Sequence, residues 1–157
     1  MPRIWRISNY ADLEGRGGLR AGQRWHTRGR RVVYCAPSPA AAILETLAHF
    51  EIDSIADLPS SYQLLSIEFP DSVRRTCVEL KGLPRDWLDA RQLATTREIG
   101  DRWLAEARYP GLEVPSALAP ETWNVLLNPL LLEGTGIRIA GIARYPFDPR
   151  LFKVVGG

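Results

Sequence analysis

Glu45 is the residue whose surroundings point most directly to chemistry. It falls in a segment that should be helical, because Ser38 is a typical N-cap residue and Pro39 is favoured at the first helical position. The helix is predicted to end at about Phe50. At about 100° per residue, Glu45 lies nearly opposite the apolar stripe that must face the core, which comprises Ile43, Leu47 and Phe50.

Small residues surround Glu45 on the outward side of this helix. They are Ala41, Ala42 and Ala48, with His49 beside them. A ligand could approach the carboxylate closely across such a face. The same pattern also fits a solvated glutamate that pairs with His49 four residues later.

Arg24 is the second candidate, in the segment 23–27 that follows a glycine-rich loop. Its planar guanidinium suits a phosphate group, and Trp25 beside it supplies a flat ring. The alternative is an arginine in an ordinary loop, with Trp25 packed into the core. The preceding glycines do not form a phosphate-binding loop of the Walker type, because no strong strand precedes them and no Gly-Lys-Ser/Thr follows.

The remaining candidates are polar residues in or after predicted strands. Tyr34 lies in a short apolar strand over 32–35, where a tyrosine is usually a core residue with a satisfied hydroxyl. Ser116 follows a strand predicted at 112–114, where a polar side chain can point into a cleft. Two polar pairs come later, Trp123-Asn124 and Asn128-Pro129, although asparagine before proline is also a common turn signal.

Several other kinds of site are not predicted. The two histidines, His26 and His49, are too few and too far apart for a metal site, so no metal is expected. No Gly-x-Ser-x-Gly motif surrounds Ser116, which argues against a serine hydrolase. Paired carboxylates of the glycosidase type cannot be identified by their spacing.

The chain as a whole fits one domain over residues 1–157. No apolar run approaches the roughly 18–20 residues of a membrane span, and the first residues lack the apolar block of a secretory signal. Cys35 and Cys77 are expected to be buried free thiols, in line with a cytoplasmic location. The net charge of +2 is too small to indicate nucleic acid binding by itself.

The pattern of elements predicts how these residues are positioned. Strands are expected over 3–8, 32–35, 62–69, 112–114 and 137–145, and the segment 76–80 is expected to pair with the strand over 62–69. A helix over 95–108 should place Ile99 and Trp103 on one face, with Leu104 and Ala107 beside it. Strands outnumber helices without strict alternation, which predicts a compact α+β domain with mixed or antiparallel sheets and flanking helices.

The order and spacing of these motifs resemble the RES domain over nearly the whole chain. The RES pattern has an Arg-Trp loop, a strand ending in Tyr-x-Ala and a helix carrying a glutamate, which correspond to 22–26, 32–36 and 38–45 here. Its second half has a Pro-Ser and an Asn-Pro element, similar to 115–116 and 128–129. The family's asparagine after the Arg-Trp pair is His26 in this chain, which leaves open how this loop contacts a ligand.

The resemblance implies a toxin of a bacterial toxin–antitoxin operon with a fold similar to ADP-ribosylating toxins. Such proteins deplete NAD by hydrolysis or phosphorolysis of its nicotinamide–ribose bond, and some transfer ADP-ribose to a cellular protein instead. NAD would thus be the substrate, phosphate or a protein a further reactant, and an Xre-type antitoxin the partner. Membrane and direct nucleic acid partners are not expected. Apolar residues that could meet the antitoxin are Trp87, Leu88 and 130–132.

The family's site residues fall on four positions of this sequence, namely Arg24, Tyr34, Glu45 and Ser116. Glu45 would stabilise the positive charge that develops on the ribose, and Arg24 would grip the pyrophosphate. Tyr34 would stack on the nicotinamide or orient the ribose, and Ser116 would bind the ligand from the opposite wall. The predicted substrate site also includes Trp25, His26 and Asn128.

Two readings outside this chemistry remain open from the sequence. One is a catalytically dead family member retained as a binding protein, which the four intact positions argue against. The other is a small nucleic-acid-binding module, whose phosphate contacts would be salt-dependent. Its contacts would come from the clustered arginines, namely Arg28, Arg30, Arg31, Arg74 and Arg75.

Overall fold

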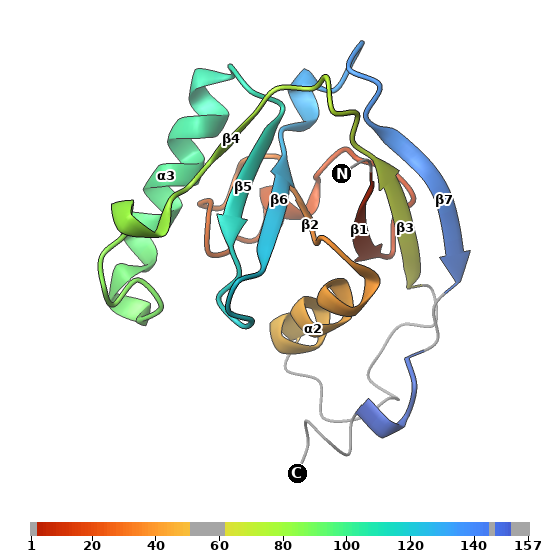
Figure 1. The fold of residues 1–157 in the computed structure, drawn as a ribbon, viewed down its shortest axis with the longest axis horizontal. Helices are drawn as coiled ribbons and strands as arrows, with labels where there is room; N and C mark the ends of the chain where they lie inside the picture. Colours follow the sequence, from red (N-terminus) through yellow and green to blue (C-terminus); the bar gives the residue numbers. More distant parts are fainter. Residues whose placement is uncertain (1–2, 51–61, 145–146, 152–157) are drawn as a thin grey trace.

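Two sheets joined at one point form the framework of the molecule (Figure 1). The computed structural model describes residues 3–50, 62–144 and 147–151, without the side chain of Phe50. The first sheet is antiparallel and has the order β1-β3-β7. Its strands are β1 (Arg3–Ser8), β3 (Gln63–Glu68) and β7 (Arg138–Arg144).

The second sheet has the order β2-β6-β5-β4 and is mixed. Its strands are β2 (Val33–Cys35), β6 (Trp123–Leu127), β5 (Gly111–Pro115) and β4 (Arg75–Cys77). Trp5 of β1 and Ala36, directly after β2, exchange backbone hydrogen bonds of 2.9 and 2.7 Å. This bridge holds the two sheets together and fixes where the chain leaves β2 for the next helix.

Helix α2 (Pro39–Phe50) begins as the sequence predicts. The Ser38 hydroxyl accepts a hydrogen bond of 3.1 Å from the Ala41 amide, which confirms Ser38 as the N-cap residue. Leu47 is buried and Ile43 partly buried against the first sheet. Ala42 was predicted to flank Glu45 on the outward side and is instead buried, because its small side chain lets the helix approach β1 and the bridge closely.

Helix α3 (Leu93–Glu106) covers the face of the second sheet beside β4 and β5 (Figure 1). Trp103 is buried there, with Ile99 and Leu104 partly buried beside it, as predicted. The helix starts and ends two residues earlier than predicted. Ala107 adopts the left-handed conformation that ends the helix, with φ 51°, so it is exposed instead of facing the core.

The shorter helical segments complete the connections. They are α1 (Gly17–Arg20), η2 (Leu80–Gly82), η3 (Ala90–Gln92) and η4 (Pro129–Leu131). One apolar cluster lies between the two sheets, a second between the four-stranded sheet and α3, and a third beneath α2. No helix in the described ranges is long and apolar enough to cross a membrane.

The mixed α+β class is confirmed, whereas one predicted strand pairing is wrong. The segment 76–80 does not pair with β3, because β1 and β7 occupy both edges of that strand. Instead β4 runs parallel to β5 at the open edge of the second sheet. Cys77, predicted to be buried, is exposed on this edge strand, while Cys35 is buried and its burial raises the thiol pKa to about 12.

Strand β6 is not among the predicted strands, and β7 differs slightly from its prediction. A register shift between Ser66 and Ile67 of β3 interrupts the regular alternation of β7. The expected last residue of β7, Tyr145, lies outside the described residues.

Candidate active site

Strand register brings the second half of the chain next to Tyr34. Tyr34 of β2 lies directly opposite Leu126 of β6. Since side chains alternate along a strand, Asn124 is on the same face of the sheet as Tyr34. Val114 of β5, opposite Asn124, shares this face, which packs toward α3. The four-stranded sheet thus presents Tyr34 and Asn124 together.

The Glu45 carboxylate reaches from α2 to the ends of two strands of this sheet. Its Oε1 accepts a hydrogen bond of 2.7 Å from the Ser116 hydroxyl and one of 2.9 Å from Nδ2 of Asn124. Figure 1 shows α2 beside the turn that joins β5 to β6, which carries Ser116. Both donors use the same oxygen, and Oε2 accepts no hydrogen bond from the described residues. Glu45 therefore has one anchored oxygen and one available oxygen.

Ser116 has no hydrogen-bonding capacity left for a ligand. A hydroxyl has one hydrogen and two lone pairs. The hydrogen is donated to Glu45, and the oxygen accepts from the amides of Leu118 (3.1 Å) and Ala119 (3.2 Å). The sequence predicts that Ser116 hydrogen-bonds the ligand from the opposite wall of the site. In the structure it is buried, contacts Glu45 directly and holds it in place.

The Tyr34 hydroxyl forms hydrogen bonds inside the protein. It lies 2.7 Å from Nδ1 of His26, whose Nε2 lies 3.1 Å from the Ala21 carbonyl oxygen. A carbonyl only accepts, so Nε2 carries the hydrogen and Nδ1 accepts the Tyr34 proton. The Trp25 amide donates to the same hydroxyl at 3.3 Å. Burial raises the pKa of Tyr34 and lowers the pKa of His26, so both rings stay neutral near pH 7.

Arg24 carries a charge that no described carboxylate neutralises. Its guanidinium donates one long hydrogen bond of 3.3 Å to the Trp87 carbonyl and lies 5.6 Å from the centre of the Trp87 ring. Trp87 in turn packs 5.9 Å from Trp25 in the apolar cluster that contains Val114. Arg24 therefore stands on the same face of the sheet as Tyr34. It makes no ion pair with Glu45, which leaves both charges available to one extended ligand.

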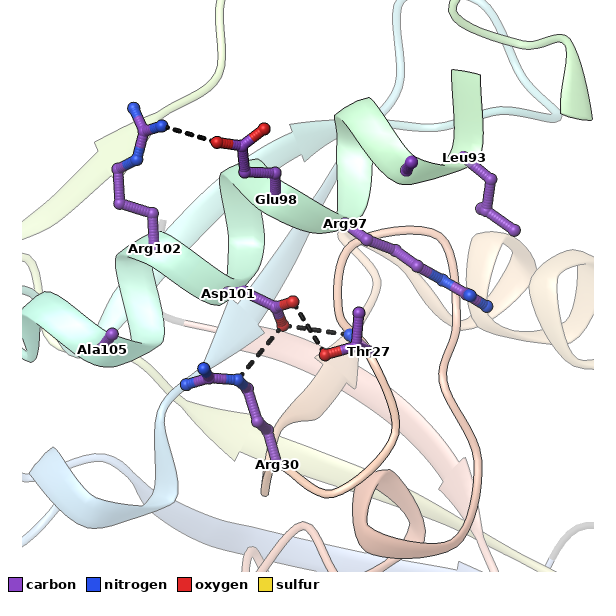
Figure 2. Close-up of a pocket in the computed structure, with 9 residues that line it drawn as sticks. Thr27, Arg30, Leu93, Arg97, Glu98, Asp101, Arg102 and Ala105 are labelled. Atoms are coloured by element: carbon purple, nitrogen blue, oxygen red, sulfur yellow. Dashed lines mark hydrogen bonds and ion pairs between the residues drawn. The ribbon is translucent and has the colours of Figure 1, made fainter. Parts of the chain in front are cut away.

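Helix α3 fixes the backbone of the loop that carries Arg24. The Thr96 hydroxyl donates to the Arg24 carbonyl at 2.6 Å, and Nε of Arg97 donates to the Gln23 carbonyl at 2.7 Å. Asp101 accepts from the amide and hydroxyl of Thr27 at 3.0 and 2.8 Å, as Figure 2 shows. These four contacts hold the loop at both ends of the Arg24-Trp25 pair.

The hollow drawn in Figure 2 does not contain the candidate reacting residues, although Thr27, Arg97 and Asp101 line it. It has a volume of about 600 Å³ and lies on the outer side of α3. Its charged residues are largely paired with each other, since Asp101 lies 3.5 Å from Arg30 and Glu98 lies 3.0 Å from Arg102. Neither Arg24 nor Glu45 lines it. The candidate site is therefore defined by the hydrogen bonds of its residues and by the strand register, and not by this hollow.

Three residues predicted to contact the substrate are buried beneath the site. Trp25, His26 and Asn128 are 3%, 0% and 2% exposed. The Asn128 side chain accepts from the Leu130 amide at 3.1 Å and caps η4. These side chains are covered by protein and support the residues around them, so their contact with a substrate stays a prediction. The family's asparagine position, His26 here, orients Tyr34.

Asn124 is a residue of the candidate site that the sequence did not assign. The sequence pattern singles it out only as part of the Trp123-Asn124 pair. The available signal was a polar side chain inside the apolar run 123–127. Burying an amide in such a run requires a partner, and that partner is Glu45.

The chain belongs to the RES domain family, whose model matches residues 3–148. It is 44% identical over 149 residues to the protein named Toxin Res of Pseudomonas putida, with 95% of this chain and 99% of the relative covered. It is 34% identical to the Prs ADP-ribosylating toxin of Sphingobium sp., with 96% of each chain covered.

A solved structure has the same fold. It is a chain of the M. tuberculosis MbcT–MbcA toxin–antitoxin complex, with a TM-score of 0.70 over 99% of this chain and 88% of that chain. The sequence identity is 17%, so this similarity concerns the fold alone.

Proposed function

We propose that this protein is the toxin of a toxin–antitoxin pair and that it cleaves the nicotinamide–ribose bond of NAD. The observation that carries the proposal is the Glu45 carboxylate, anchored through Oε1 with Oε2 available, on the sheet face that also holds Tyr34 and the Arg24 loop. Membership of the RES family and the names of the two relatives support the toxin role.

This reaction requires a negative charge near the ribose and does not require an acid to protonate the leaving group. When the bond between C1′ of the ribose and the nicotinamide nitrogen breaks, its electron pair goes to the pyridinium nitrogen. Nicotinamide then leaves as a neutral base without a proton, and C1′ gains oxocarbenium character. The oxygen of the acceptor forms the new bond to C1′, and any proton that it carries is released to solvent. Oε2 of Glu45 supplies negative charge where the positive charge develops.

Arg24 would bind the pyrophosphate of NAD. Its planar fork can donate two parallel hydrogen bonds, whereas lysine is a point charge. We expect Arg24→Lys to raise KM for NAD by about tenfold or more with a smaller change in kcat, because uniform binding is lost. Steady-state kinetics measure both constants. Arg28→Lys, an exposed arginine in the same loop, should leave both unchanged.

Tyr34 would act through its ring, because its hydroxyl is occupied by His26 and Trp25. We expect Tyr34→Phe to retain kcat within about tenfold while losing about 1–3 kcal/mol of stability, since two buried partners become unsatisfied. Tyr34→Ala should lose the stacking surface and most of the activity. NAD turnover and thermal unfolding of both variants measure this, and a Tyr34→Phe variant as inactive as Tyr34→Ala would assign the hydroxyl to the reaction.

The identity of the acceptor that attacks C1′ distinguishes two candidate activities. Water or phosphate would make the protein an NAD glycohydrolase or phosphorylase. The name of the Sphingobium relative favours the second candidate, transfer of ADP-ribose to a cellular enzyme. Purified protein incubated with NAD, with and without phosphate or a bacterial lysate, separates the outcomes by mass spectrometry. Absence of both NAD loss and ADP-ribosylated protein would contradict both.

The proposed partner is a cognate antitoxin of the Xre type, encountered in the cytoplasm. Two of the leucines predicted for this contact, Leu88 and Leu130, are 53% and 78% exposed, while Trp87 is buried. Nucleic acid binding is less well supported, because Arg30 lies near Asp101 and Arg75 pairs with Glu113 at 2.9 Å.

A further inference from the structure

The Asn124 amide is only half satisfied. Its Nδ2 donates to Glu45, while its Oδ1 is buried and has no hydrogen-bond partner in the described part of the chain. Buried side-chain oxygens and nitrogens otherwise have partners in these ranges, since the Glu14 oxygen that lacks a hydrogen bond forms an ion pair with Arg16. Oδ1 of the half-buried Asn124 is thus an exception among the buried polar atoms, and the amide lies directly beside the candidate reacting carboxylate.

The orientation of this amide follows from chemistry. A carboxylate only accepts hydrogen bonds, so the amide nitrogen must face Glu45, and turning the amide over would bring two acceptors together. Oδ1 therefore points away from Glu45. It belongs to the sheet face that also carries the apolar residues Val114 and Leu126.

Stability alone does not account for asparagine at this position. The hydrogen bond from Asn124 to the Glu45 carboxylate is charge-assisted and stabilises the fold, whereas leaving the Oδ1 acceptor buried without a partner costs a comparable amount. The two effects offset each other at Asn124. An apolar residue of similar size would remove the unsatisfied Oδ1 and pack against its neighbours.

We propose that Asn124 is a positioning residue for Glu45 in the reaction proposed above, on which this inference rests. Asn124 in β6 and Ser116 in the turn directly after β5 donate to the same oxygen. Two donors on Oε1 fix the plane of the carboxylate and leave Oε2 to face the ribose. An amide does this at every pH, whereas an acid at this position would do so only when protonated.

Two variants separate this role from a structural one. Asn124→Leu removes the hydrogen bond and the unsatisfied oxygen together. We expect its midpoint of thermal unfolding to stay within about 2 °C of the wild type or to rise, while kcat for nicotinamide release falls about 10²-fold and KM changes less than about threefold. A merely structural residue would lower the midpoint and leave kcat per folded molecule unchanged.

Asn124→Asp adds a pH dependence that Asn124→Leu lacks. Two carboxylates at this distance raise the pKa of one of them, so the protonated acid donates to Glu45 at low pH. Activity relative to the wild type should be highest near pH 5 and fall toward the Asn124→Leu level as the pH rises. A kcat of Asn124→Leu within about threefold of the wild type, or an Asn124→Asp pH profile that superposes on the wild type, would overturn the proposal.

The positioning role of Asn124 can also be tested without an activity measurement. In crystal structures, Glu45 should lose its single conformation in Asn124→Leu and keep it in the wild type. An unchanged Glu45 conformer in Asn124→Leu would contradict positioning. Failure of the wild type to release nicotinamide would contradict the proposed function instead, so the two failures are distinguishable.

Discussion

Replacing Glu45 by glutamine is expected to slow nicotinamide release from NAD by about 10³-fold or more while leaving the fold intact. Glutamine keeps a carbonyl oxygen that can accept the hydrogen bonds from Ser116 and Asn124. It removes only the negative charge that would face the developing oxocarbenium ion. The measurement is kcat from the rate of nicotinamide formation, together with the midpoint of thermal unfolding.

The matched control is Glu121→Gln. Glu121 is exposed and lies in the β5–β6 connection that also carries Ser116. No ion pair involves it in the described ranges. The same chemical change there should leave kcat unchanged. A Glu45→Gln variant that retains kcat within about tenfold of the wild type would remove the carboxylate from the chemistry.

Replacing Gly100 by alanine is expected to cause the largest loss of stability. An added Cβ would lie 1.6 Å from the carbonyl oxygen of Trp25, a backbone atom that no rotamer change can move. Helix α3 must then separate from the Arg24 loop, which also weakens the contacts made by Thr96 and Arg97. We expect a loss of about 3 kcal/mol or more, which lowers the midpoint of thermal unfolding by about 10 °C.

Gly82→Ala is the control for this prediction. Nothing lies within 4 Å of a Cβ at Gly82, and its backbone does not require glycine. Gly82→Ala should therefore change the midpoint by less than about 2 °C. A Gly100→Ala protein as stable as Gly82→Ala would show that α3 does not clamp the loop.

Local sequence signals were sufficient for the helix that carries Glu45. Ser38 and Pro39 start it by capping chemistry, and Leu47 faces the core through helical periodicity. The direction of Glu45 away from the core followed from the same periodicity. The expectation of a solvated glutamate paired with His49 did not include Ser116 and Asn124, because those donors lie in the β5–β6 turn and in β6, 71 and 79 residues later.

Contacts between distant segments were not readable from the sequence. The pairing of β4 with β5 depends on β3 already having two partners, and the burial of His26 depends on Tyr34. The resemblance to the RES family predicted Arg24 and Tyr34 as site residues without indicating how they are held. In the structure, α3 holds the Arg24 loop and His26 holds the Tyr34 hydroxyl.

The most direct test of the proposed activity is product analysis of NAD incubated with the purified wild-type protein. We predict free nicotinamide together with an ADP-ribosyl product whose pyrophosphate is intact, whether the acceptor is water, phosphate or protein. Unchanged NAD after prolonged incubation with phosphate and lysate would contradict it. So would nicotinamide mononucleotide with AMP, because those products require cleavage of the pyrophosphate instead of the bond at C1′.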